Sequence, residues 1–333
     1  MCNFCVQHGE GKRWYANASN YAMDLESDLQ RRGFIVDFIR NFEANRRTAN
    51  AGLAALRFVP RPARKYFTPK PEAAAQKHHF GQPVPLEECA SIFDIATNIT
   101  RLPCVCRGAM QPGSDAESCC IVMTVNKHDT LLSEGFRDYS GGPASQGFER
   151  LTKDQALAYL RSAEERGLCH TAWTFITPFI AAICNCDLPS GCMAMKIQLR
   201  GGIRLMWKGE DVIRRNEELC TGCRRCVKRC PFGAISLAPR QKGVIVDRKK
   251  CWGCGICRTA CAPGALSLEP RLSSSDVATA WYPQIEALTT KTPGYEKNDN
   301  WKRVTGNARR WRDDPGILDS LTSLLALDRS HLP

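Results

Sequence analysis

Eight cysteines between positions 220 and 261 fall into two runs that have the same internal spacing. The first run is Cys220, Cys223, Cys226 and Cys230, and the second is Cys251, Cys254, Cys257 and Cys261. Both runs read C-x2-C-x2-C-x3-C, which lets three thiolates on one short loop surround one side of an iron–sulfur cubane. Zinc sites more often use two separated C-x2-C pairs. The spacing therefore favours iron–sulfur chemistry over zinc.

These two runs resemble the bacterial ferredoxins that carry two [4Fe-4S] clusters. In that spacing the fourth cysteine of each run ligates the other cluster. The resemblance thus implies one cluster on Cys220, Cys223, Cys226 and Cys261, and another on Cys251, Cys254, Cys257 and Cys230. It covers residues 211–270 and has one departure, since Ala262 separates Cys261 from Pro263 whereas Pro231 follows Cys230 directly.

The residues that follow each run are also similar. Ala234-Ile235-Ser236-Leu237 follows the first run, and Ala265-Leu266-Ser267-Leu268 follows the second. A short strand is expected after each turn, so the unit is an internal duplication. Gly222, Gly253 and Gly255 let the loop backbone approach the cluster closely. The predicted fold class is α+β, with a ferredoxin-like module of two βαβ-type units appended to a cysteine-rich α+β domain.

The chain is basic, and the basic residues gather around the cysteine runs. It has 46 Lys and Arg against 34 Asp and Glu, a formal charge of +12. Each oxidised cluster with four thiolates adds −2, which leaves about +8. Arg224, Arg225, Lys228 and Arg229 lie inside the first run. This distribution predicts an acidic redox partner protein, with an anionic membrane surface, nucleic acid or simple solvation as alternatives.

Cysteine content and motifs limit the cellular setting and the cofactors. There are 19 cysteines and no N-terminal signal pattern, which favours metal ligands in a reducing cytoplasm over disulfides. The apolar run over residues 171–184 is too short to span a membrane and is expected in the core. No G-x-G-x-x-G or G-x4-G-K-[ST] motif predicts a nucleotide site.

The rest of the chain divides into three expected parts. Residues 1–80 read as a basic helical arm with a helix over 24–46, followed by a proline-broken linker. Residues 81–195 read as a cysteine-rich α+β domain, and residues 271–333 as a C-terminal extension with a short helix over 317–327. The middle part is expected to contain a helix over 86–100 with Cys89 in the core, a strand over 121–125, and a helix over 152–166 with a capping box and a Gly167 stop.

Two C-x-C pairs in the middle part predict a third metal site. In extended backbone, residues i and i+2 point to one face, so each pair can present two thiolates together. The expected ligands are Cys104, Cys106, Cys184 and Cys186, with Cys119, Cys120 and Cys192 as spare candidates. A third iron–sulfur cluster, a structural zinc and unligated buried thiols all remain compatible with this pattern.

The N-terminal half also resembles a little-characterised group of iron–sulfur proteins from anaerobic prokaryotes. The similar phrases are His8-Gly9-Glu10-Gly11-Lys12 with Trp14-Tyr15, Leu102-Pro103-Cys104-Val105-Cys106-Arg107, and Ile183-Cys184-Asn185-Cys186. That group carries further consecutive cysteines after the second pair, where this chain has Asp187. At the start of the chain, Cys2, Cys5 and His8 have the spacing of half a metal site. His170 is expected to be a hydrogen-bonded core residue, and His78 and His79 are isolated candidates.

Three functions fit these features. The first is an electron-transfer protein that relays single electrons through two [4Fe-4S] clusters as a subunit or partner of an oxidoreductase. The second is a reductase or activating enzyme with an additional cluster in residues 81–195. The third is a basic nucleic-acid-binding protein with structural clusters, although no recognition pattern supports it. The sequence assigns no catalytic residue.

Overall fold

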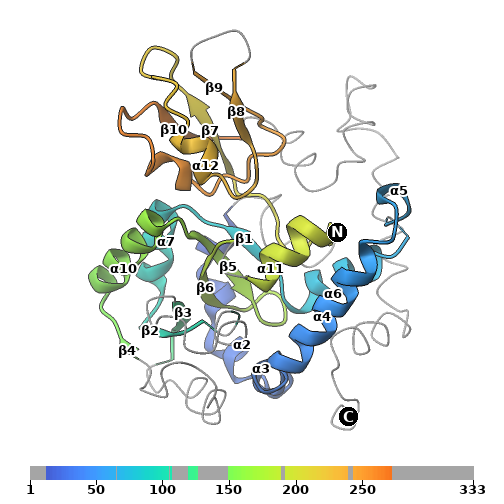
Figure 1. Ribbon diagram of the computed structural model, residues 1–333. Helices are drawn as coiled ribbons and strands as arrows, with labels where there is room; N and C mark the ends of the chain where they lie inside the picture. The colour runs from blue at the N-terminus through green and yellow to red at the C-terminus, as the bar shows by residue number, and fades with distance from the viewer. Residues whose placement is uncertain are drawn as a thin grey trace, which may run out of the picture.

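The computed structural model describes residues 13–64, 66–104, 106, 119–126, 149–188, 192–238 and 243–271. Over these residues, a domain built on a six-stranded sheet, here called the sheet domain, carries a smaller unit with two two-stranded sheets. In Figure 1 the smaller unit lies above the sheet domain. The predicted helix over 317–327 and the N-terminal candidates Cys2, Cys5 and His8 lie outside the described residues.

The large sheet has the strand order β1-β5-β6-β3-β2-β4, and each neighbouring pair is antiparallel. The strands are β1 (Gly81–Pro83), β2 (Asn98–Pro103), β3 (Cys119–Thr124), β4 (Glu149–Arg150), β5 (Cys169–Thr174) and β6 (Ile180–Cys186). The predicted strand over 121–125 corresponds to β3, and the apolar run over 171–184 supplies most of buried β5 and β6. Because neighbours are antiparallel, β2 and β6 end where β3 and β5 begin. Four strands therefore meet at one end of the sheet.

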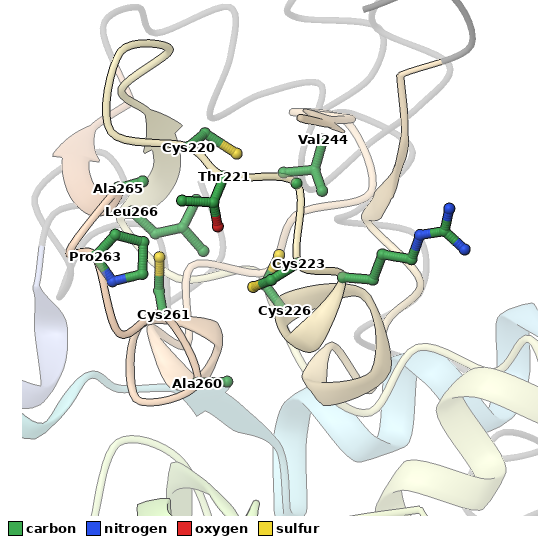
Figure 2. A pocket seen from close by; sticks show the side chains of 12 residues that line it. Cys220, Thr221, Cys223, Cys226, Val244, Ala260, Cys261, Pro263, Ala265 and Leu266 are labelled. Carbon is green, nitrogen blue, oxygen red and sulfur yellow. The ribbon is translucent and has the colours of Figure 1, made fainter. Parts of the chain in front are cut away.

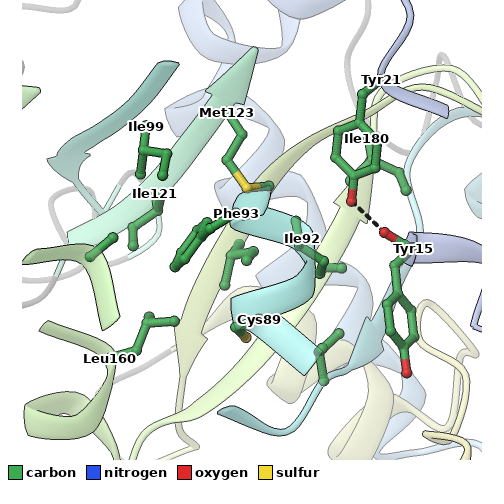
Figure 3. Packing of buried hydrophobic residues seen from close by; sticks show 14 of the residues in the cluster. Tyr15, Tyr21, Cys89, Ile92, Phe93, Ile99, Ile121, Met123, Leu160 and Ile180 are labelled. Carbon is green, nitrogen blue, oxygen red and sulfur yellow. Dashed lines mark hydrogen bonds between the residues drawn. The ribbon is translucent and has the colours of Figure 1, made fainter. Parts of the chain in front are cut away.

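One face of the sheet is covered by α7 (Leu86–Ile95) and α10 (Lys153–Arg166), as Figure 3 shows for part of this core. Cys89 is fully buried there, as predicted. The Thr152 side chain and Gln155 form the expected capping box, and Gly167 ends α10 with φ of 99°. The helix predicted over 86–100 is too long, since it stops at Ile95 and residues 98–103 pair with β3 as β2.

The opposite face of the sheet is covered by the N-terminal helices, by α11 (Met193–Lys196) and by the smaller unit. Ile35 and Ile39 of α3 (Leu29–Arg40) and Met195 of α11 are buried against this face. Cys254 and Ile256 of the smaller unit belong to the same core. Cys254, a predicted cluster ligand of the second run, is thus part of the packing of the sheet domain.

The single helix predicted over 24–46 is wrong in two respects. The segment forms α2 (Met23–Ser27), α3 and α4 (Phe42–Leu56), and the Asp28 side chain caps α3 by accepting from the Arg31 amide at 2.7 Å. Leu29, which begins the new helix after this break, is 82% exposed, so it does not belong to an apolar face that runs through the whole segment. The proline-broken segment also folds, into α5 (Arg61–Arg64) and α6 (Pro69–His78), since proline is compatible with the first turn of a helix.

The N-terminal residues also pack into the domain. Trp14, Tyr15 and Tyr21 of the turns η1 (Trp14–Ala16) and η2 (Ala18–Tyr21) are buried beside α7, and Tyr21 Oη donates to the Tyr15 carbonyl at 2.7 Å (Figure 3). Glu72 of α6 accepts from the Arg204 side chain at 3.0 Å. The expected arm and linker therefore contribute to the core of the sheet domain from residue 13 onward.

The smaller unit, residues 211–271, is here called the duplicated unit. Its elements are β7 (Asp211–Arg215), α12 (Arg225–Arg229), β8 (Ile235–Leu237), β9 (Val244–Val246), η4 (Ile256–Arg258) and β10 (Leu266–Pro270). The strands predicted after the two runs are confirmed as β8 and β10. β7 pairs with β10 and β8 with β9, so each half contributes one strand to each sheet. Gly222 and Gly253, equivalent in the two halves, have φ of 72° and 70°.

The segment between η3 (Ile197–Gly201) and β7 attaches the duplicated unit to the sheet. It runs beside β1, where the Gly81 amide donates to the Leu205 carbonyl at 3.0 Å and the Trp207 amide donates to the Gly81 carbonyl at 2.8 Å. Arg258 of η4 donates twice to the Glu87 carboxylate of α7, at 2.5 and 2.9 Å. These contacts hold η4 and its neighbouring cysteines against the sheet domain.

No helix in the described part of the chain is both long enough and apolar enough to cross a membrane.

Candidate metal centres

Four cysteines from both runs line one cavity of the duplicated unit. Cys220, Cys223, Cys226 and Cys261 surround this cavity, which we call the outer set (Figure 2). The rest of the lining is mostly small and apolar, with a hydroxyl group from Thr221 and one charged residue, Arg224. The first three cysteines come from the loop before and the start of α12, and Cys261 comes from the turn after η4. These are the four residues that the ferredoxin resemblance assigns to one cluster.

The other four cysteines form a second group, the inner set, of Cys230, Cys251, Cys254 and Cys257. Cys230 lies within electrostatic range of Cys251 and Cys254, and Cys257 lies within range of those two and of Cys230. Cys257 is also in range of Cys226 of the outer set. The two sets are therefore neighbours, and each takes one cysteine from the opposite run.

Backbone amides point at the sulfur atoms of the inner set. The Ile213 amide donates to Cys251 Sγ at 3.5 Å, and the Ala234 amide donates to Cys230 Sγ at 3.3 Å. Gly253 allows this loop to close, because a Cβ there would lie 2.2 Å from the Asp211 carbonyl oxygen. Amide donors to sulfur and a closely approaching backbone are features that suit an iron–sulfur cluster.

The two sets differ in exposure to solvent. In the outer set Cys223 is exposed and Cys220 and Cys261 are partly buried, while in the inner set only Cys230 is more than slightly exposed. Burial raises the pKa of Cys257, with a further increase from the neighbouring thiols of its set. A thiol held this way ionises only when cations, such as those of a cluster, replace its proton. The outer set faces solvent and the inner set faces the sheet domain.

Comparison with known families agrees with this geometry. Residues 219–266 match the family model described as a 4Fe-4S dicluster domain. The chain therefore contains an iron–sulfur, ferredoxin-type domain, and an electron-transfer role in general follows from it. No curated protein and no solved structure is similar enough to match the chain.

A second gathering of thiols lies at the end of the sheet where β2, β3, β5 and β6 meet. Here six side chains form a closed ring in which each thiol is within hydrogen-bonding reach of the next. The order around this thiol ring is Cys104, Cys106, Cys192, Cys186, Cys184, Cys120 and back to Cys104. The four predicted ligands are thus brought together, joined by two of the spare candidates.

The register of the sheet explains the ring. Cys184 and Cys186 are two residues apart on β6 and so point to one face, as predicted from the C-x-C pattern. Cys120 contacts Cys184 from β3, and it pairs with Leu102 on β2, two residues before Cys104. The remaining two thiols come from Cys106, just after β2, and from Cys192 at the start of α11. The side chain of the spare candidate Cys119 lies outside the described residues.

The ring thiols perturb one another. Hydrogen bonds to Cys104 and Cys192, followed by burial, raise the pKa of Cys106. Hydrogen bonds from Cys106 and Cys186 lower the pKa of Cys192 well below its ordinary value, because two thiols donate to it. Thr171 Oγ1 lies 3.6 Å from Cys186 Sγ on the neighbouring strand. The pKa of Cys192 is thus lowered, whereas those of Cys106, Cys120, Cys184 and Cys186 are raised.

Neither gathering has the geometry of a mononuclear site. In the described residues, no three His, Cys, Asp or Glu side chains converge to hold one metal ion. This holds for the inner and outer sets as well as for the thiol ring.

One cysteine that the sequence did not single out joins the two regions. Cys169, at the start of β5, pairs across the sheet with Cys186 of the ring and is hydrogen-bonded to Cys254 of the inner set. The donated bond lowers the pKa of Cys254. Its only sequence signal is its position at the start of an apolar run, which indicates a core residue.

Among the described residues, His170 is a hydrogen-bonded core residue and His79 is a stacked one. His170 Nδ1 is 2.6 Å from Asn185 Oδ1, as expected for a core histidine, and its Nε2 is 3.7 Å from Glu164. Burial lowers the pKa of His170 to about 4 and raises that of Glu164 to about 7. His79 stacks on Trp173 with ring centroids 4.7 Å apart.

Proposed function

We propose that this protein relays single electrons through two [4Fe-4S] clusters, as a subunit or partner of a redox enzyme. The observation that supports it most directly is the pair of crossed thiol sets inside the matched dicluster domain. Clusters whose sulfur ligands accept amide hydrogen bonds and lie close together exchange electrons without any bond being made or broken. The protein supplies the ligands, their separation and the polarity around them.

The exposed outer set is the expected point of electron entry or exit. Arg224, Arg225 and Lys228 are exposed around α12, next to exposed Cys223. A basic surface at the cluster attracts an acidic partner protein and increases the association rate at low ionic strength. An acidic partner with its own redox centre at the contact surface is therefore the partner chemistry that this face fits.

Redox titration of anaerobically purified protein, followed by electron paramagnetic resonance (EPR), tests the relay. Each of the two dicluster sites should take up one electron and release it on reoxidation. Clusters that cannot be reduced reversibly would show a structural role instead. Replacing Arg224 and Arg225 with Glu should slow electron exchange with a small acidic redox protein, and the difference from wild type should shrink as salt is added. Replacing exposed Lys77, in α6 of the sheet domain, with Glu is the matched control.

A second function, a reductase in which the sheet domain holds a substrate-reducing centre, is favoured by the thiol ring. The ring lies beside the inner set, where electrons from the outer surface would arrive. This function requires a redox-active centre at the ring and a substrate that reaches it. It predicts turnover of an electron acceptor that disappears when the ring is disrupted, while both dicluster signals remain.

A further inference from the structure

We infer that the thiol ring binds a third iron–sulfur cluster, which exchanges electrons with the cluster on the inner set through the contact between Cys169 and Cys254. The binding of this cluster does not depend on the relay function proposed above. The electron exchange does rest on it, because the inner set must then hold a reducible cluster.

The number and origin of the thiols support a polynuclear centre. The ring has six thiols, each in contact with two others, which is more than the four ligands of a single structural zinc ion and enough to supply the four thiolates of a [4Fe-4S] cluster. They come from the chain just after β2, from β3 and β6, and from the start of α11, so ordinary apolar packing does not account for a closed ring of one residue type. Buried cysteines that serve only as small apolar side chains, such as Cys89, pack against aliphatic and aromatic neighbours.

The surroundings of the ring supply one backbone amide donor to sulfur and one hydroxyl group that can donate or accept. The Thr171 hydroxyl lies beside Cys186, and the Met195 amide lies beside Cys192. The inner set has donors of the same kind from Ile213 and Ala234. Donors to ligand sulfur stabilise the added negative charge of a reduced cluster.

The local charge also suits an anionic centre. Lys196 lies within electrostatic range of Cys192 and Cys106, and Arg46 and Arg200 lie near Lys196. An oxidised [4Fe-4S] core with four thiolates carries a charge of about −2. Lys196 of α11 is therefore a cation within reach of two ring thiols, and Arg46 of α4 and Arg200 of η3 lie beside it.

The ring and the inner set are separated by one residue. Cys169 pairs with Cys186 across β5 and β6, and its thiol donates to the Cys254 thiolate. In the exchange step one electron leaves the reduced inner cluster, which becomes oxidised by one electron, and the ring cluster becomes reduced by one. An external reductant, such as dithionite or the reduced acidic partner, replaces the electron. No proton transfer is needed.

Metal and sulfide analysis of the full-length protein, purified anaerobically, tests the inference. Wild-type protein should contain roughly twelve irons and twelve sulfides, and replacing both Cys184 and Cys186 with Ala should lower each to roughly eight. Cys89→Ala, which removes a buried thiol from the other core, should keep the wild-type content. In reduced wild-type protein the EPR signal of the inner cluster should show spin coupling to the ring cluster. The double variant should lose this coupling and keep the two dicluster signals.

Other outcomes would overturn the inference. Roughly eight irons with two zinc ions in wild-type protein would show a binuclear zinc site on six thiolates, and roughly eight irons without zinc would show free thiols. Both results come from wild-type protein, so a double variant that fails to fold does not affect them. Irons well below eight would instead contradict the proposed relay, which separates the two failures.

Discussion

The duplicated unit and the thiol ring gather the same side chain by opposite means. In the duplicated unit, each set takes three cysteines from one short loop and a fourth from the other run, so the spacing along the chain nearly determines the ligands. In the thiol ring, the cysteines come from strand ends that are adjacent only because of the register of the sheet. The first arrangement is readable in a local motif, and the second requires the tertiary fold.

The largest expected effect tests the crossed assignment in the duplicated unit. Cys230→Ala and Cys251→Ala lie in different runs but in one set, so both should remove the inner cluster and roughly four irons. Iron analysis and EPR of the reduced proteins should show the same missing signal in both variants. Cys226→Ala, in the outer set, should instead remove the EPR signal of the outer cluster. A Cys230 variant that resembles the Cys226 variant would indicate that each run ligates its own cluster.

The next largest effect concerns the backbone of the loop that carries Cys251 and Cys254. Gly253→Ala places a Cβ 2.2 Å from the Asp211 carbonyl oxygen, so the loop must move and the inner cluster should be lost. Gly233 also has a positive φ, 63°, but in Gly233→Ala no atom would lie within 4 Å of the added Cβ. It should lower the free energy of unfolding by only about 1–2 kcal/mol and keep its iron. Equal iron loss in both variants would show that the positive φ, and not crowding around the added Cβ, makes glycine necessary at these positions.

The sequence predicted the duplicated unit better than the sheet domain for a physical reason. In the duplicated unit, the strands after both runs follow from local patterns and are confirmed. In the sheet domain, only local features such as the capping box of α10 and the buried Cys89 were predicted as well. The break at Asp28 is a local helix cap that the periodicity does not show, and the early end of α7 goes with the pairing of residues 98–103 with β3. Helical periodicity over 24–46 and 86–100 therefore overestimated the lengths of the helices.

The same limit applies to the prediction of the thiol ring, because local patterns identify only some of its cysteines. The C-x-C rule placed Cys184 and Cys186 on one face because that rule needs only an extended strand. The roles of Cys120 and Cys192 depend on which strands are neighbours, and the sequence could name them only as spare candidates. Cys169 lacked even that signal, since its position beside Cys254 exists only when the duplicated unit packs on the sheet.

Acid should affect the two regions differently, because all six histidines lie outside residues 211–270. Burial among Phe38, Trp173 and Phe175 lowers the pKa of His79 from 6.5 to about 4. Between these values the unfolded chain binds a proton that the folded chain does not, so stability is lost as pH falls below 6.5. His79→Phe should reduce this loss by up to about 1.4 kcal/mol per pH unit.

Anaerobic urea unfolding at pH 7.5, 6.5 and 5.5 measures this effect. The wild-type midpoint should fall more steeply than that of the variant between pH 6.5 and 5.5, and the two should run in parallel above pH 6.5. The sheet-domain tryptophan Trp173 stacks on His79 and reports its unfolding by fluorescence. Parallel curves over the whole range would show that His79 is protonated in the folded protein as easily as in the unfolded chain.

The smallest expected effect lies at the contact between the two regions. Cys169→Ala removes a thiol that donates to Cys254, and hydrogen bonds to ligand sulfur favour the reduced, more negative cluster. The reduction potential of the inner cluster should therefore become more negative, by on the order of tens of millivolts, while the iron content stays unchanged. Redox titration followed by EPR measures the shift, with Cys89→Ala as the control. A potential that stays unchanged or moves upward would mean that the Cys169 thiol does not donate to the cluster ligand, so that the two regions are merely packed together at this point.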